Sequence, residues 1–348
     1  MTPVRGPVVV VGDVGIDVLT RPRMPIVHGG EATSDIALAP GGAGGNTAAW
    51  LAAHDVGVSL IARIGDDQAG LAARSALEAV GVRCVFAVDE HLPTCVVVVL
   101  IDAAGERTML SDRGANAAFR AADVALDRAA GAVVGTAGAV AGEAPGLPHL
   151  HLSGYVLLDP GSREAGLAAL TGARERGWTT SVDPQAAHLV AAVGADTFLD
   201  WVRGVDLLLP NEIEAEALGG PEAVLTSVSQ VVVTYGAHGA RWFTADGEQR
   251  APAPTVDCLD STGSGDAFNA GLLASWLTDA DPVRALAAGI RAGSAAAAAL
   301  GARPRPWPIG RDLTGRDAVG QVAEPPGIPS RRASVEAPGQ ARPATAEP

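Results

Sequence analysis

The sequence predicts an α/β protein whose mostly parallel central sheet is covered by helices on both faces. Short runs of β-branched residues recur along the chain, and they alternate with stretches rich in Ala and Leu that are long enough to form helices. This alternation of strands and helices is the order that builds parallel sheets. We therefore expect a layered fold in which the sheet is buried between helices.

The residue composition of each stretch predicts whether it forms a strand or a helix. The apolar runs are only about four to eight residues long and are rich in Val, Ile and Thr, which favour strands. The predicted strands are 8–11, 94–101, 149–152, 179–182, 205–209 and 231–234. The longer stretches consist largely of the strong helix formers Ala and Leu. The predicted helices are 45–55, 69–80, 163–176, 265–277 and 282–300.

The 348 residues, 48% of them hydrophobic and 18% charged, suit a globular protein with a sizeable core. Residues 304–348 are rich in Pro, Ala, Arg and Glu, and we expect a disordered tail there. The apolar run at 8–11 is too short for a secretion signal, and no apolar stretch approaches the length of a membrane span. We therefore expect a cytoplasmic protein.

The formal charge of −14 argues against a nucleic-acid or anionic-membrane partner, because polyanion binding needs a basic surface. All 25 basic residues are arginines, which excludes a P-loop lysine, a protein-kinase strand lysine and a Schiff-base lysine. The three cysteines are an odd number and lack metal-ligand spacing, so neither a disulfide framework nor a zinc site is indicated.

The segment at 260–266, Asp-Ser-Thr-Gly-Ser-Gly-Asp, carries the strongest signal for chemistry, because a helical pattern follows it directly. A helix that opens on small residues offers unpaired N–H groups and a partial positive charge to an anion. Gly263, Ser264 and Gly265 would form an anion hole for a transferring phosphoryl group. Asp266 would then be the general base that accepts the proton of an attacking hydroxyl. The structural alternative is a first-turn helix acid.

At this point the chain resembles the ribokinase-like (PfkB) family of carbohydrate and nucleoside kinases. The family's D-T-x-G-A-G-D pattern corresponds to residues 260–266, and its G-G-x-x-x-N pattern corresponds to residues 41–46. The resemblance implies a three-layer α/β/α kinase domain over residues 1–303 with a small β-sheet lid. The lid segments would be about residues 14–40 and 92–111. It also implies ATP and Mg²⁺ as cofactors.

For the phosphoryl acceptor, the resemblance implies that Gly41, Gly42 and Asn46 meet hydroxyl groups, together with Asp17 and Asp13 after the first strand. Carboxylate and amide groups suit this task because they make several directed hydrogen bonds. A flexible loop before a helix is the structural alternative for residues 41–46, as is a turn role for Asp13.

For the nucleotide, the resemblance implies that Asn211 and Glu214 organise Mg²⁺ and the phosphates, with Glu214 acting through water. Thr234, Gly236 and Gly239 would lie along ATP. The alternatives are an ordinary helix start at Pro210 and a tight hairpin turn after residue 234. Asp260, with Thr262, stands where many relatives arrange a monovalent-cation loop, so K⁺ is a further candidate.

The expected reaction is ATP-dependent phosphorylation of a hydroxyl on a small sugar, with Asp266 as the base. A nucleoside kinase of adenosine or pseudouridine type is the close alternative, and a non-catalytic ligand-binding sensor is the alternative from another class. A dinucleotide-binding oxidoreductase is disfavoured because G-x-G-x-x-G is missing after the first strand. Ala43 stands where ribokinases have lysine, so the acceptor is not tied to ribose. The lid edge could pair in a homodimer.

Overall fold

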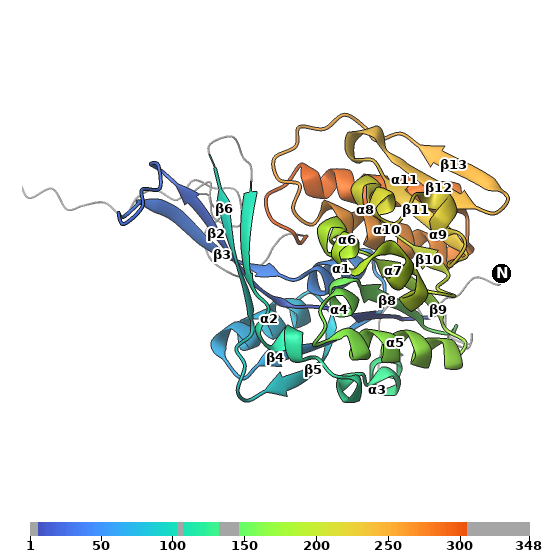
Figure 1. The fold of residues 1–348 in the computed structure, drawn as a ribbon, viewed down its shortest axis with the longest axis horizontal. Coiled ribbons are helices and arrows are strands. Elements are labelled where there is room, and N and C mark those ends of the chain that lie inside the picture. Colours follow the sequence, from blue (N-terminus) through green and yellow to red (C-terminus); the bar gives the residue numbers. More distant parts are fainter. Residues whose placement is uncertain (1–5, 103–106, 132–145, 305–348) are drawn as a thin grey trace, which may run out of the picture.

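The computed structural model describes residues 6–102, 107–131 and 146–304. The tail expected over 304–348 lies outside the described residues apart from Pro304. The described chain forms a central nine-stranded sheet and a separate four-stranded sheet that projects from one end of it (Figure 1). The predicted α/β architecture with a mostly parallel sheet and a second, smaller sheet is confirmed.

The central sheet is parallel over most of its width. Its strand order is β13-β12-β11-β10-β9-β8-β1-β4-β5, and only the β11–β12 and β12–β13 pairs are antiparallel. The strands are β1 Val8–Val11, β4 Val58–Gly65, β5 Arg83–Asp89, β8 His149–Ser153, β9 Thr179–Asp183, β10 Leu207–Leu208, β11 Gln230–Thr234, β12 Ala240–Thr244 and β13 Gly247–Ala251.

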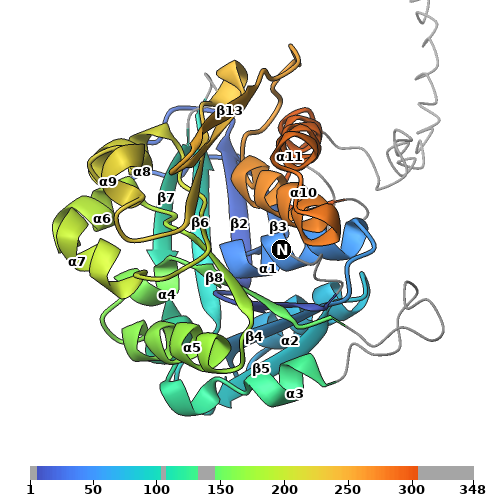
Figure 2. The same cartoon turned by 90° about the vertical axis from the view of Figure 1, so that its right-hand side faces the viewer.

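Helices cover both faces of this sheet (Figure 2). One face carries α1 Ala43–Ala53, α2 Gln68–Glu78, α10 Ser264–Asp279 and α11 Pro282–Ala297. The other carries α3 Leu126–Ala130, α4 Tyr155–Leu158, α5 Arg163–Glu175, α6 Ala187–Val193, α7 Ala195–Trp201, α8 Glu212–Ala217 and α9 Pro221–Val224. Side chains of β1 alternate between the two cores: Val8 and Val10 join one, and Val9 and Val11 the other. A central strand buried on both faces explains the unbroken valine run.

The second sheet has the order β3-β2-β6-β7. Its strands are β2 Gly15–Pro22, β3 Ser34–Gly41, β6 Cys95–Ile101 and β7 Arg107–Asp112, and only the β2–β6 pair is parallel. The apolar strand predicted at 94–101 therefore belongs to this sheet and not to the central one. In the part of the chain that the structure describes, no helix has the length and apolar character needed to span a bilayer.

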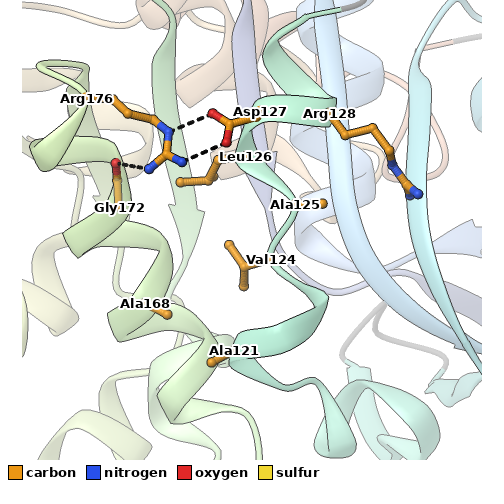
Figure 3. Close-up of a pocket in the computed structure, with 9 residues that line it drawn as sticks. All are labelled: Ala121, Val124, Ala125, Leu126, Asp127, Arg128, Ala168, Gly172 and Arg176. Atoms are coloured by element: carbon orange, nitrogen blue, oxygen red, sulfur yellow. Dashed lines mark hydrogen bonds and ion pairs between the residues drawn. The ribbon is translucent and has the colours of Figure 1, made fainter.

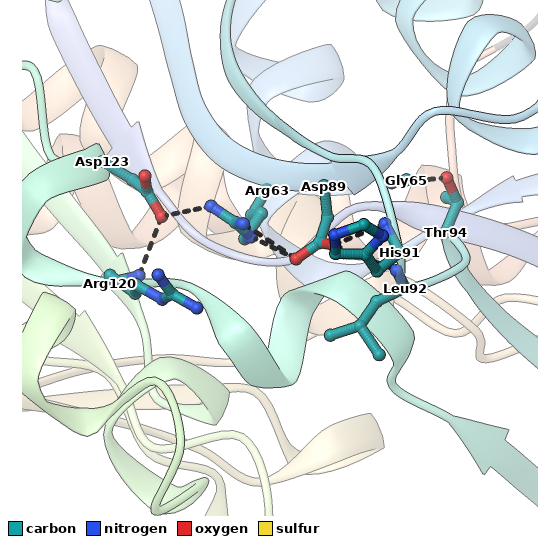
Figure 4. A network of polar contacts seen from close by, with 8 residues as sticks. All are labelled: Arg63, Gly65, Asp89, His91, Leu92, Thr94, Arg120 and Asp123. Atoms are coloured by element: carbon teal, nitrogen blue, oxygen red, sulfur yellow. Dashed lines mark hydrogen bonds and ion pairs between the residues drawn. The ribbon is translucent and has the colours of Figure 1, made fainter.

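A polar network fixes the point where the chain leaves the central sheet for β6 (Figure 4). The Arg63 guanidinium on β4 donates to Asp89 at 2.8 Å and to Asp123 at 2.9 Å. Asp89 also accepts from the N–H groups of His91 (2.9 Å) and Leu92 (3.0 Å). These N–H groups and the guanidinium hold the pKa of Asp89 well below its usual range. The connection to the second sheet is thus anchored to β4.

Candidate active site

Polar residues from several strands lie together at the carboxyl edge of the central sheet. Asp13 follows β1, Asp183 ends β9, Asn211 follows β10 and Thr234 ends β11. The N-terminus of α10 meets the same edge, because Gly263, Gly265 and Asp266 line one cavity with Asp183, Asn211, Glu214 and Thr234. Parallel strands present their carboxyl ends on one side, where α/β proteins commonly bind ligands.

Two glycines, Gly263 and Gly265, shape the start of α10, and the backbone requires glycine at the first of them. Gly263, the residue before the helix, has a left-handed φ of 73°, and a Cβ there would lie 2.4 Å from the Ala302 carbonyl oxygen. A Cβ on Gly265 would meet nothing within 4 Å, so this residue faces open space in the cavity. The first turn of a 16-residue helix is thereby left accessible, as an anion-binding site requires.

Asp266 lies in that first turn and is buried, with 8% of its surface exposed. Its carboxylate accepts a hydrogen bond from the Asn46 side-chain amide at 3.0 Å and from the Thr47 hydroxyl at 3.3 Å. Burial raises the pKa of Asp266 to about 7, against the lowering effect of the Asn46 amide, and the nearby Asp13 charge raises it further. A carboxyl group poised near neutral pH suits proton transfer.

The acceptor-side residues surround this carboxylate through α1 and β2. Gly42 has φ 87°, and a Cβ there would lie 2.6 Å from the Val14 Cα. A Cβ on Gly41 would lie 2.1 Å from an Asp17 carboxylate oxygen, so this glycine makes room for Asp17. Burial raises the pKa of Asp17 to about 6, although the Arg303 charge lowers it. Close approach of the backbone therefore requires glycine at position 42, whereas a side chain at position 41 would displace the Asp17 carboxylate.

Asp13 is held by the backbone of α1. Its carboxylate accepts from the N–H groups of Ala43 (3.1 Å) and Gly44 (3.4 Å) and from the Ser153 hydroxyl (2.9 Å). These bonds fix the helix that carries Asn46 and Thr47. The geometry matches the turn role that was the alternative for Asp13.

On the nucleotide side, Asn211 and Glu214 form a reciprocal cap at the start of α8. The Glu214 N–H donates to Asn211 Oδ1 at 2.9 Å, and the Asn211 N–H donates to Glu214 Oε2 at 2.9 Å. The helix-start alternative is therefore present in the structure. Glu214 is nevertheless 3% exposed and not a solvated helix acid, and burial raises its pKa. A buried carboxylate in a polar cavity can still serve a cation.

A larger cavity of ≈ 410 Å³ adjoins the polar one, and the two share Thr234 and Gly265. Gly236 and Gly239 line it within the turn that joins β11 to β12. The two glycines predicted to lie along ATP are therefore also part of the hairpin turn that was their structural alternative. Its inner walls are mainly apolar and include Phe268 on α10 and Ile290 on α11. Its volume falls within the range of small-molecule sites.

Asp260 lies just before α10, and both of its carboxylate oxygens accept hydrogen bonds. Its oxygens accept from the N–H groups of Thr262 and Gly301, both at 2.9 Å. The Arg107 guanidinium, which comes from β7 of the second sheet, pairs with Asp260 and contacts Ser261 and Thr262. The second sheet therefore touches the loop that precedes the anion hole.

Comparison with known proteins decides the family. The family model described as pfkB family carbohydrate kinase matches residues 7–309, which covers most of the chain. The chain belongs to the PfkB family. As a member of it, the protein is an ATP-dependent carbohydrate kinase with the ribokinase-like fold, as the sequence predicts.

Individual PfkB kinases support this assignment. The chain is 31% identical over 301 residues to the ATP-dependent ribose-1-phosphate kinase of Halopiger xanaduensis, covering 85% of this chain and 93% of that protein. It is 28% identical over 274 residues to the aminoimidazole riboside kinase of Salmonella typhimurium, covering 76% and 79%. A putative ribokinase II from E. coli in complex with ATP and Mg²⁺ aligns with a TM-score of 0.71, 20% identity and coverage of 85% and 94%. This structural likeness shows the shared fold.

Several residues that lie at this site were not identified from the sequence alone. Asp183 is buried beside Glu214, and Asn269 donates to it at 2.7 Å. Gln185, which lowers the pKa of Asp266, has an unusual left-handed φ of 73°. The Arg303 guanidinium donates a hydrogen bond to the side-chain oxygen of Asn46. Asp183 and Gln185 lie in the segment Val-Asp-Pro-Gln at 182–185, which matches the family pattern before the nucleotide segment only in part, so the sequence signal for them is weak.

Another hollow, of ≈ 330 Å³, lies between α3 and α5 on the other face of the sheet (Figure 3). An ion pair at its rim joins Arg176 to Asp127 through two hydrogen bonds of 2.9 Å. None of the predicted site residues lines this hollow. We therefore assign the chemistry to the carboxyl edge of the sheet.

Proposed function

We propose that the protein transfers the γ-phosphoryl group of ATP to a hydroxyl of a small sugar, with Asp266 as the general base. The observation that carries this proposal is the position of Asp266. The same carboxylate is hydrogen-bonded by Asn46 on the acceptor side and lies in the helix turn that opens on the phosphate side.

In the proposed step, the acceptor hydroxyl gives its proton to the Asp266 carboxylate while its oxygen forms a bond to the γ-phosphorus. The bond between that phosphorus and the bridging oxygen breaks, and ADP leaves with the electron pair. Asp17, Gly41, Gly42 and Asn46 orient the acceptor, with Asp13 contributing by fixing α1. Orientation of this kind supplies much of the catalysis in phosphoryl transfer.

The N–H groups of Gly263 and Gly265 would stabilise the charge that builds up on the transferred group. The Ser264 N–H, also predicted for this role, instead donates to the Ser261 carbonyl oxygen at 3.2 Å. Ser264 Oγ is buried and has no hydrogen-bond partner among the described residues, so it is free to donate to a phosphate oxygen. Thr234, Gly236 and Gly239 would lie along the nucleotide. The apolar cavity beside Phe268 suits the adenine ring.

Mg²⁺ fits the polar cavity through Asp183 and Glu214, with Asn211 beside them. Both carboxylates are buried, which raises their pKa values, and the Glu214 charge raises the pKa of Asp183 further. A bound cation would stabilise the ionised form of both groups. No cluster of three or more His, Cys, Asp or Glu exists in the described ranges, which suits an ion that keeps most of its waters. When bound, Mg²⁺ would neutralise charge on the ATP phosphates.

For the acceptor, we propose a monosaccharide or its phosphate ester, with ribose 1-phosphate as the first compound to test. The relative from Halopiger, named for that activity, supports this choice. The strands of the second sheet contain no aromatic residue that could stack on a nucleobase. A nucleoside remains the second candidate, because the Salmonella relative is named for a riboside substrate.

The proposal also covers the second sheet, the domain and its location, the oligomeric state and K⁺. The second sheet acts as a lid over the acceptor, and residues 1–303 form one kinase domain in the cytoplasm. A homodimer forms through this lid, whose edge strands expose Ile36 and Leu38 on β3 and Met109 and Leu110 on β7. K⁺ would bind at Asp260 only by sharing that carboxylate with Arg107.

The experiment is ADP release with Mg-ATP against a panel of pentoses, hexoses, sugar phosphates and nucleosides. Release that depends on one acceptor class identifies the substrate. Faster turnover of nucleosides than of every sugar or sugar phosphate would replace the first candidate with the second.

A further inference from the structure

Arg303 is a buried arginine on the acceptor side of the site, with 6% of its surface exposed. Its Nε donates to the side-chain oxygen of Asn46 at 3.0 Å, and its Nη2 donates to the Gly41 carbonyl oxygen at 2.7 Å. Both partners belong to the segment that carries the predicted acceptor contacts. One guanidinium edge therefore holds two parts of that segment together.

The contact with Arg303 determines which way the Asn46 amide points. A guanidinium only donates hydrogen bonds, so it must face the amide oxygen. The amide nitrogen then faces the opposite way and donates to Asp266 Oδ2 at 3.0 Å. A flipped amide would set its N–H₂ against the guanidinium and its oxygen against the carboxylate. Both contacts would then be unfavourable.

The backbone next to Arg303 is fixed on the other side of the site. The Trp50 indole on α1 donates to the Ala302 carbonyl oxygen at 3.0 Å, and the Gly301 N–H donates to Asp260 at 2.9 Å. Gly45 leaves room for the side chain, because a Cβ there would lie 2.4 Å from Nη2 of Arg303. Arg303 is thus held in one place by contacts from α1 and from the loop before α10.

Stability does not explain this arginine. Its Nη1 is buried without a hydrogen-bond partner among the described residues. Burial lowers the pKa of Arg303 to about 10, although the nearby Asp17 and Asp266 charges raise it. Replacing a buried charge by an apolar side chain of similar size is often neutral or stabilising. A buried, partly unsatisfied charge at this place calls for a functional explanation.

We infer that Arg303 is a positioning residue that fixes the Asn46 amide and, through it, the orientation of the catalytic carboxylate of Asp266. This inference rests on the proposed role of Asp266 as the base. Arg303 also supplies positive charge where the other groups that face Asp266 are Asp13, Asp183 and Tyr155. Removing Arg303 should therefore make Asp266 harder to ionise as well as less well oriented.

A double-mutant cycle tests this chain of contacts. Arg303→Met, Asn46→Ala and the double variant are compared with the wild type in kcat/KM for the acceptor. Each single variant should lose about 10–100-fold, as outer-sphere supports typically do. At alkaline pH, where Asp266 is ionised with or without the Arg303 charge, the double variant should be no worse than Asn46→Ala alone, because the positioning effect of Arg303 acts through Asn46. Arg83→Met is the matched control, since Arg83 on β5 also has a buried Nη1 without a partner among the described residues.

Two further measurements separate positioning from a structural role. The KM for ATP and the unfolding midpoint of Arg303→Met should stay close to the wild type, while the acid limb of its kcat/KM profile moves to higher pH. If Arg303→Met does not fold, Arg303→Gln replaces it in the cycle. Losses that multiply in the double variant, or an Arg303 variant within twofold of the wild type, would overturn the inference. A wild type without acceptor-dependent ADP release would instead refute the proposed function.

Discussion

Asn46 donates its side-chain amide to Asp266 at 3.0 Å across a sequence separation of 220 residues. The contact joins the segment proposed to hold the acceptor to the helix turn proposed to hold the phosphoryl group. Because Thr47 binds the other oxygen of the same carboxylate, α1 sets the orientation of Asp266 at two points. The proposed base is thus positioned by the acceptor side of the site.

The first prediction concerns pH. Burial raises the pKa of Asp266 to about 7, and only the deprotonated carboxylate can accept the acceptor's proton. The kcat/KM for the acceptor should therefore rise with pH, with a midpoint near pH 7, and fall as Asp266 is protonated below it. A profile measured from pH 5 to 9 tests this. A kcat/KM that stays level down to pH 5 would contradict a raised pKa for Asp266.

The second prediction concerns Gly42, where both φ and space exclude a side chain. Gly42→Ala should unfold at lower urea concentration and lose most acceptor turnover, because α1 must shift. Gly81→Ala is the matched control: Gly81 has the same φ of 87° but open space around it. The control should bear only the backbone strain, about 1–2 kcal/mol, and keep its kcat/KM. Equal effects in the two variants would contradict the steric argument.

The third prediction concerns Mg²⁺. Glu214→Gln and Asp183→Asn each remove a carboxylate from the polar cavity. Each should raise the Mg²⁺ concentration needed for half-maximal activity by about 10–100-fold. Glu216→Gln, an exposed change on the same helix, provides the control. Unchanged Mg²⁺ dependence in both cavity variants would place the metal elsewhere.

The fourth prediction concerns two buried histidines of β8. His149 and His151 are hydrogen-bonded to the Ser181 hydroxyl at 2.8 Å, and burial lowers their pKa values to about 3 and 4. The unfolded chain therefore binds protons below pH 6.5 that the folded chain does not, so the free energy of unfolding should fall from pH 6.5 towards pH 4. Each histidine should contribute a slope of about 1.4 kcal/mol per pH unit.

Urea unfolding over that pH range measures the slope. His149→Gln should make it shallower by one proton, whereas His28→Gln, at an exposed position, should leave it unchanged. A wild-type slope that does not depend on His149 would mean that other groups control acid stability.

The sequence of residues 260–266 was sufficient to predict a helix that begins after glycine and carries an acid in its first turn, because these are local features. It was less informative about Glu214, since a helix cap and a metal-binding carboxylate share one pattern and differ only in burial. Arg303 has no local signature at all. Its role depends on a contact with Asn46, 257 residues away, which only the folded chain brings about.

The same limit applies to the fold. Strand β4 was not predicted because Arg63 interrupts its apolar pattern, and this charge is accommodated by Asp89 and Asp123 from other elements. The strand at 94–101 was assigned to the small sheet only through the family resemblance, because strand pairing depends on tertiary contacts. Long helices such as α10 and α11 were predicted to within a few residues at each end.

The most direct test of the account is the turnover of Asp266→Asn. This substitution keeps the shape of the side chain and an oxygen that can accept from Asn46, but it removes the proton acceptor. We expect kcat to fall about 10²–10⁴-fold while ATP binding is retained, with Asp281→Asn at the half-buried N-cap of α11 as the control. Turnover within a few fold of the wild type would contradict the assignment of Asp266 as the base.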